Sequence, residues 1–382
     1  MSSTLRNLAA ASRPEQRAAV VAALRTEHLS RSDLISLLGV SSSLVTRVVR
    51  SLLDEGLVQE IGAVSSTLGR PPVQMQLNAQ YGHIVAVSCE GEQLRTGLYD
   101  LHGVEVRANA MTLGDRILDM PTITDSIDAV QRDAGVEEKR LLGIAFSVPG
   151  VVDAGTGVVS QAPDLKWQES VPLRGLLEDL YAVPVTVDND VNLMVIAERE
   201  EGGAVGIDDV IYLYLGRSGV GAGIISGGRL TQGGHGAAGE IGVIPLGAAR
   251  GSVSGTRVED RISVAAVGRA LKENGLDAAP APIAALVRWA EAKNEDACGI
   301  RSDALDALAH SILILSAILD PTVVLVGGAA RDLLGIDLLS MTERLASQTA
   351  TPPALDFAHL DSGAVLQAAQ MRCWRRILAG GI

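Results

Sequence analysis

The sequence has few of the residues that mark a secreted, metal-bound or membrane protein. Its 382 residues include three cysteines and no Cys-x-x-Cys pair, which excludes a disulfide framework and a zinc site made of cysteines. No apolar run reaches the roughly 20 residues of a membrane span, and the N-terminus lacks the regions of a signal peptide. Aromatic residues make up only 3%, so the core must be aliphatic. We therefore expect a cytoplasmic protein that has no membrane partner.

Chain length and the uneven distribution of charge indicate several domains that differ in net charge. A chain of this length exceeds one ordinary core, so two or three domains are expected. The net charge is −13, yet residues 1–80 carry eight arginines against six acidic residues, a balance of +2, while the remainder carries −15. This asymmetry favours a DNA-facing head on an acidic body.

The first eighty residues have the pattern of a winged helix-turn-helix. Helices are predicted over 14–26, from a Ser-x-x-Asp start at Ser30, and over 42–55 behind a capping Ser41. Short strands at 57–61 and 73–77 then enclose a loop that would form the wing. A helix, a short turn and a capped second helix are the arrangement that enters the major groove.

The exposed face of the third helix carries hydroxyls and arginines and has no acidic residue from Ser41 to Leu53. Such donors contact phosphates and base edges. The alternative is a small helical bundle that packs on the body. The predicted DNA-binding residues are Ser41, Ser42, Ser43, Thr46, Arg47 and Arg50 of this helix, with Arg70 at the tip of the wing.

Glycine crowds the segment 215–243, which ends in Gly233–Val243. Such density is tolerated where the backbone approaches a ligand or turns sharply. Glu240 is the one carboxylate in the tight part of this stretch, and it can accept hydrogen bonds from hydroxyls. Taken alone, the pattern fits a ligand loop or a pair of hairpin turns with Glu240 in solvent.

Ala238-Gly239-Glu240-Ile241-Gly242 resembles the Ala-Gly-Glu-Ile-Gly-His signature of the ROK family (repressors, open reading frames and kinases). Gly69-Arg70-Pro71-Pro72 after the winged helix resembles the repressor branch. The resemblance covers essentially the whole chain and implies an α/β fold. A winged helix-turn-helix over 1–80 would precede a two-lobed, actin-like sugar-kinase body over 81–382. The first lobe would hold about 81–200 with the C-terminal helix, and the second about 201–363.

The resemblance also implies a sugar site. In the family kinases an Asn-Asp pair binds sugar hydroxyls and the Asp is the catalytic base; Asn189-Asp190 matches that pair here. Glu240 and Glu259 match two further sugar contacts, so the implied sugar-binding residues are Asn189, Asp190, Glu240 and Glu259. An Asx turn with a helix N-cap is the alternative for this Asn-Asp segment.

Two departures from the family pattern concern phosphate and zinc. The phosphate-binding turn Asp-x-Gly-Gly-Thr-Lys is replaced by Ser88–Gln93, in which Glu90 and Glu92 stand. Each carboxylate would repel a phosphate charge by roughly 3 kcal/mol, for unit charges about 5 Å apart at an effective dielectric of about 20. No catalytic residue and no ATP turnover are therefore expected. The zinc ligands of the family, one His and three Cys, are replaced by Val243, Arg250, Ser252 and Arg257, so no cofactor is expected.

The sequence therefore predicts a ROK-type transcriptional regulator, a repressor of carbohydrate genes. Its binding to a double-stranded DNA operator would be modulated by a sugar or sugar derivative, and it would act as a homodimer or homotetramer. Two alternatives stay open. One is an active sugar kinase with a fused DNA-binding head, and the other is a repressor released by a protein partner.

Overall fold

The structure is a computed structural model that describes residues 8, 11–63, 73–114, 116–136, 140–217, 219–246 and 256–380. Its internal contacts divide the chain into two compact units. Unit 1 holds Met1–Ser147, Pro172–Val187 and Ala369–Ile382, and unit 2 holds Val148–Val171 and Asp188–Ala368. Residues 148–171 and 188–200, which we expected in the first lobe, thus cluster with unit 2.

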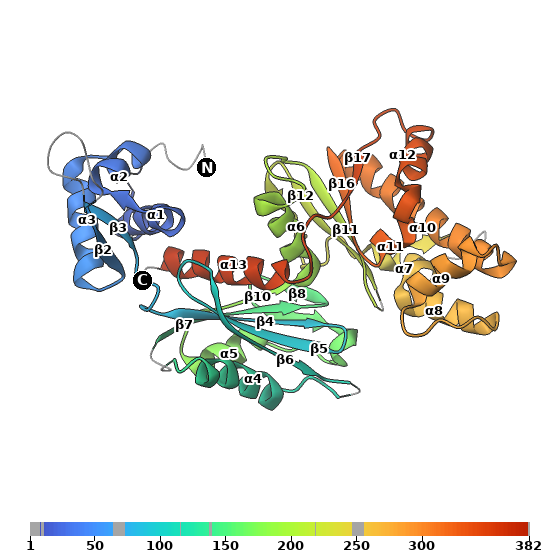
Figure 1. The fold of residues 1–382 in the computed structure, drawn as a ribbon, viewed down its shortest axis with the longest axis horizontal. Coiled ribbons are helices and arrows are strands. Elements are labelled where there is room, and N and C mark those ends of the chain that lie inside the picture. The colour runs from blue at the N-terminus through green and yellow to red at the C-terminus, as the bar shows by residue number, and fades with distance from the viewer. Residues whose placement is uncertain are drawn as a thin grey trace. The chain divides into compact units, whose positions relative to one another are not determined.

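The head of unit 1 contains the three predicted helices and the two predicted wing strands (Figure 1, blue). The helices are α1 (Arg13–Thr26), α2 (Arg31–Leu38) and α3 (Ser42–Asp54). The strands are β1 (Leu29–Ser30), β2 (Val58–Ala63) and β3 (Val73–Leu77), paired in the order β1-β3-β2. The short β1 was not predicted. As expected, Ser30 and Asp33 form a capping box on α2, and Ser41 caps α3.

The body part of unit 1 is a five-stranded sheet in the order β10-β7-β4-β5-β6. Its strands are β4 (His83–Glu90), β5 (Gln93–Tyr99), β6 (Glu105–Thr112), β7 (Leu141–Val148) and β10 (Val185–Asn189). Strands β4, β5 and β6 form an antiparallel meander, and β7 runs parallel to β4. Helices α4 (Met120–Asp133) and α5 (Leu173–Tyr181) cover one face, and α13 (Ala364–Gly380) covers the other (Figure 1).

Unit 2 is built on a second five-stranded sheet in the order β13-β12-β11-β16-β17. Its strands are β11 (Val210–Leu215), β12 (Val220–Ser226), β13 (Arg229–Leu230), β16 (Val323–Gly328) and β17 (Ala354–Phe357). Helix α6 (Asp190–Glu201) packs on this sheet through β11 and β12. Ideal Cβ atoms on Gly221 and Gly223 of β12 would lie 3.4 Å and 2.6 Å from atoms of Val191, so the helix approaches the strand closely.

Shorter elements complete unit 2 around this sheet. They are β8 (Val151–Asp153), β9 (Val158–Gln161), η3 (Pro163–Leu165), η4 (Ile241–Val243), β14 (Pro245–Leu246), β15 (Thr256–Arg257), α7 (Val258–Ile262), α8 (Val264–Glu273), α9 (Pro282–Glu291), α10 (Glu295–Leu319), α11 (Ala330–Leu334), η5 (Gly335–Asp337) and α12 (Leu338–Ala346). An aliphatic core joins the sheet to α7–α12, as the scarcity of aromatic residues required.

Capping side chains set where two helices of unit 2 begin. Helices α7 and α8 are separate, because Ser263 is extended (φ −63°, ψ 151°) and caps α8 through the Ala266 N–H. Helix α10 begins at Glu295, because the Asn294 side chain caps it. By length and composition, α10 alone among the described helices would suffice to cross a membrane, a test that core helices also pass. About half of its apolar stretch is buried.

Candidate DNA interface and sugar site

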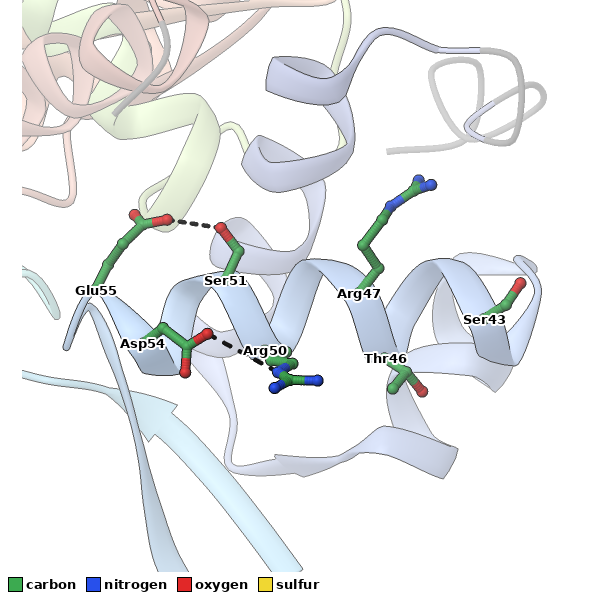
Figure 2. Close-up of a pocket in the computed structure, with 7 residues that line it drawn as sticks. All are labelled: Ser43, Thr46, Arg47, Arg50, Ser51, Asp54 and Glu55. Atoms are coloured by element: carbon green, nitrogen blue, oxygen red, sulfur yellow. Dashed lines mark hydrogen bonds and ion pairs between the residues drawn. The ribbon is translucent and has the colours of Figure 1, made fainter.

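Helix α3 presents two rows of side chains along its length (Figure 2). We call Ser42, Thr46, Arg50 and Asp54 the outer row and Ser43, Arg47, Ser51 and Glu55 the α1-side row. Leu44, Val45, Val48, Val49 and Leu52 lie on the opposite side of the helix, where they are buried and anchor it. Both rows border a shallow hollow on the head, lined by Ser43, Thr46, Arg47, Arg50, Ser51, Asp54 and Glu55. The two predicted arginines therefore lie on neighbouring rows.

The α1-side row is tied to α1. The Arg47 Nη2 donates to Oε1 of Gln16 at 3.1 Å. Gln16 is 5% exposed, and its Nε2 donates to the Ala11 carbonyl at 2.9 Å. Because the partner of Arg47 is a neutral amide that is fixed by the backbone, the guanidinium is oriented and its positive charge is not cancelled.

Farther along this row, Glu55 is neutralised by Arg17. The two guanidinium nitrogens donate to its carboxylate at 2.6 Å and 2.5 Å, and this pairing lowers the pKa of Glu55. In the outer row, Arg50 lies 3.9 Å from Asp54, with both side chains largely exposed. Asp54 and Glu55 follow directly after the acid-free range Ser41–Leu53, and the pattern of that range gave no sign of these two carboxylates at the end of the interface.

The predicted DNA-binding residues Ser41 and Arg70 are not part of these two rows. The Ser41 Oγ accepts the Leu44 N–H at 3.3 Å and lies 3.1 Å from the Ser43 Oγ, so its first role is to cap the helix. Arg70 falls in residues 64–72, outside the described part of the chain.

The Asn-Asp pair of the predicted sugar site lies where β10 passes into α6. The Asn189 Oδ1 accepts the Asn192 N–H, and its Nδ2 donates to the Gly150 carbonyl, both at 2.9 Å. The N-cap that we considered as an alternative is thus present and orients Asn189. Asp190 is the first residue of α6 and is half-buried. A carboxylate is favoured there by the helix dipole.

The glycines of Gly233–Val243 serve close backbone packing. An ideal Cβ on Gly236 would lie 1.9 Å from the Val152 carbonyl oxygen, and one on Gly239 would lie 1.8 Å from that of Ala222. Any side chain would therefore displace the loop. The segment from Gly150 to Val152 consequently borders both Asn189, through the Gly150 carbonyl, and this glycine loop, through Val152.

The two predicted glutamates come together beside Gly242. An ideal Cβ on Gly242 would lie 2.8 Å from Oε2 of Glu259, so the glycine leaves room for that carboxylate. Removal of solvent around the Glu240 carboxyl, and secondarily the charge of Glu259, raises the pKa of Glu240. Glu240 is nevertheless an exposed residue, so solvent screens part of both effects. Arg257 lies 3.3 Å from the second oxygen of Glu259.

The described residues around this site do not fit a zinc ion. Val243 is an exposed apolar side chain and Arg257 is a cation paired with Glu259, so neither can ligate a metal. The other two replaced positions, Arg250 and Ser252, lie outside the described residues. Within the described ranges, no group of three or more His, Cys, Asp or Glu side chains could hold a metal ion.

The turn that would hold phosphate lies in unit 1, between β4 and β5. Glu90 pairs with Gln93 across a two-residue turn, with Gly91 at φ +59° and Glu92 following. This tight hairpin places the Glu90 and Glu92 carboxylates where the family motif has glycine and hydroxyl donors.

Comparisons with known proteins agree with this architecture. Residues 87–371 match the ROK family. The xylose repressor of Caldicellulosiruptor bescii is 33% identical over 217 residues, which are 56% of this chain and 54% of the relative. The match thus spans about half of that relative. A crystal structure of a ROK family transcriptional regulator, a homolog of the E. coli MLC protein, superposes with a TM-score of 0.77 at 21% identity. It covers 95% of this chain and 96% of its own.

A second solved structure matches a smaller share of the chain. The ROK hexokinase from Thermus thermophilus has a TM-score of 0.62 at 25% identity and covers 78% of this chain and 100% of its own. The predicted fold class is therefore confirmed, with a body shared by family kinases and a fold shared along nearly the whole length with a regulator. This chain belongs to the ROK family.

Proposed function

We propose that the protein is a DNA-binding repressor of carbohydrate genes whose operator affinity is set by a sugar or sugar derivative. The observation that carries the proposal is the exposed face of α3, where Thr46, Arg47 and Arg50 stand clear of the buried anchor residues. This face belongs to a chain whose body has the ROK fold. The name of the matched xylose repressor supports the same function, although the match covers half of that protein.

Duplex DNA is the ligand that suits the two rows of α3. Hydroxyls and guanidinium groups on a helix of this size can enter the major groove and contact phosphates and base edges. The α1-side row supplies an oriented cation, Arg47, and the pairing of Glu55 with Arg17 removes one negative charge from the face. Asp54, the other acid in the described residues of α3 and its C-cap, lies 3.9 Å from Arg50.

A polyhydroxylated ligand suits the second site. Asp190, Glu240 and Glu259 are acceptors for hydroxyl donors, and the fixed amide of Asn189 stands beside Asp190. An anionic ligand would meet the carboxylates of Glu240 and Glu259, so a neutral sugar is favoured. We further propose that the protein does not phosphorylate this sugar, because Glu90 and Glu92 replace phosphate donors. We place it in the cytoplasm as a homodimer or homotetramer whose heads match half-sites about one helical turn apart, or a multiple of it.

The test is a DNA mobility-shift assay challenged with a panel of sugars. The operator duplex is first selected by the protein from a random pool. We expect the wild-type protein to bind that duplex and one class of sugar to change its affinity. Asp190→Ala should keep operator binding but lose about tenfold or more of the sugar response, since a hydroxyl bound to a carboxylate contributes about 1.5–3 kcal/mol.

Glu201→Ala, at the exposed far end of the same helix, is the matched control and should respond like the wild type. An equal response in Asp190→Ala would remove Asp190 from the site. No response of the wild-type protein to any sugar would favour release by a protein partner.

A further inference from the structure

A fully buried carboxylate lies near the end of α6. Glu198 has 0% exposure, and it belongs to the helix that begins at Asp190. Its Oε2 accepts the Gly203 N–H at 2.7 Å, and its Oε1 accepts the Leu360 N–H at 2.8 Å. Gly202 is required beside it, because an ideal Cβ there would lie 2.2 Å from Oε2. Buried carboxylates need such partners, so the geometry around Glu198 is closely determined.

The partner Leu360 is 162 residues away in sequence and lies just before the C-terminal helix. The chain leaves β17 at Phe357, is held at Ala358 by a backbone hydrogen bond to Val326, and enters α13 at Ala364. The His359 ring packs within 3.4 Å of the Cβ position of Gly203, in the same turn that Glu198 holds. The segment 358–363 is therefore fastened to the C-terminal end of α6 within unit 2.

The other part of α13 holds the DNA-binding head within unit 1. Arg25, in the last turn of α1, donates to Oε1 of Gln370 at 3.1 Å and to the Met371 sulfur at 2.8 Å. Its guanidinium carbon lies 5.6 Å from the ring centroid of Trp374, a cation–π contact. Helix α13 thus continues from residues grouped with unit 2 into residues that contact the head.

We propose that Glu198 is a positioning residue that couples the sugar site to the DNA-binding head. Helix α6 bears the ligand residue Asp190 at its start, and Glu198 eight residues later ties it to the segment that leads into α13. About 12 Å of helix separates the two residues. Because a helix of this length is rigid, a displacement of Asp190 also displaces Glu198, which holds the Leu360 amide. This inference rests on the proposed function, since it names the route by which the sugar regulates DNA binding.

The test variant is Glu198→Gln. The amide has nearly the same shape, but it keeps one acceptor and turns an NH₂ group toward either the Leu360 or the Gly203 N–H. We expect sugar affinity, and operator affinity without sugar, to stay within threefold of wild type. The change in operator affinity caused by saturating sugar should fall at least fivefold. A residue that only stabilises unit 2 would not lower the response while both affinities persist.

Glu201→Gln is the matched control, since it removes one carboxylate from the exposed side of the same helix and should keep the full response. A full response in Glu198→Gln would overturn the proposal. If no sugar changes the operator affinity of the wild-type protein, the proposed function itself fails, which is a different result.

Hydrogen exchange on the wild-type protein covers the case in which Glu198→Gln does not fold. The proposal requires that the sugar alter the protection of the Leu360 amide and of α13, and that Asp190→Ala lose this effect. Unchanged protection of 358–363 at saturating sugar would contradict the coupling.

Discussion

Replacing Arg47 by alanine should weaken operator binding and flatten its dependence on salt. The guanidinium of Arg47 is oriented by the Oε1 of Gln16 at 3.1 Å, and Gln16 is itself held by the Ala11 carbonyl. The partner is neutral, so the positive charge remains available to DNA. Arg50, by contrast, shares its charge with Asp54. Arg47 is therefore the arginine of α3 whose loss should have the clearest effect.

The magnitude depends on what Arg47 contacts. A phosphate contact contributes about 0.9 to the slope of log affinity against log salt, so one lost contact amounts to about 3.5-fold between 50 and 200 mM salt. A contact to a base edge instead contributes about 1–3 kcal/mol of discrimination, or roughly fivefold to 150-fold on the operator with little change on random DNA. The two cases separate when the operator and a scrambled duplex are titrated side by side.

Gln16→Ala distinguishes orientation from charge. It frees the Arg47 side chain but leaves its charge, so we expect a loss of about 1 kcal/mol, the usual net value of one hydrogen bond, with an unchanged salt slope. The assay is fluorescence anisotropy at several salt concentrations, with thermal unfolding to verify that each head is folded. Arg132→Ala, an equal loss of charge on the exposed part of α4, is the control. Coincident titrations of Arg47→Ala and the wild type on both duplexes would refute the reasoning.

Four further results are expected. Asp54→Asn should raise DNA affinity about twofold, because a carboxylate about 10 Å from a phosphate costs about 0.4 kcal/mol at the dielectric of water; an unchanged affinity would place Asp54 away from the duplex. Elemental analysis should find no zinc, and a chelator should leave the melting temperature unchanged; one zinc per chain would contradict this. A coupled assay should show no sugar-dependent ATP turnover, whereas turnover abolished by Asp190→Asn would reveal a kinase. The pKa of Glu240 is raised, so its carboxylate forms only as the pH climbs past the ordinary glutamate value. Calorimetric sugar affinity should therefore rise with pH through the folded pKa of Glu240, and Glu240→Gln should flatten the profile.

Local signals predicted the head better than the body. Capping residues and helical apolar spacing lie within a few positions of one another, so α2 and α3 could be located from Ser30, Ser41 and the buried face of α3. Strand β6 gave no such signal, because it is an edge strand without a buried face, and its residues are exposed or half-buried. The break between α7 and α8 at Ser263 was not evident from the sequence either, because apolar residues continue on both sides of it.

Motif matching located the candidate sugar residues, but their surroundings depend on tertiary contacts. The sequence could not reveal that Gly236 and Gly239 are required by the carbonyls of Val152 and Ala222. Nor could it indicate that Gln16 orients Arg47, or that Glu198 binds an amide 162 residues away. These contacts join residues that no periodicity or motif relates, so they emerge only from the folded chain.

The free energy that the proposed switch requires helps to distinguish residues that bind the sugar from residues that transmit its effect. Moving a two-state equilibrium from 1:99 to 99:1 requires a difference of about 5.5 kcal/mol in binding free energy between the states. Three carboxylates, each contributing about 1.5–3 kcal/mol to a hydroxyl, suffice only if their bonds form in one state alone. Removing Asp190 therefore lowers both sugar affinity and response. Removing the hydrogen bonds of Glu198 leaves the sugar contacts in place and lowers the response alone. The ratio of the loss in sugar affinity to the loss in response therefore identifies whether a residue binds the sugar or transmits its effect.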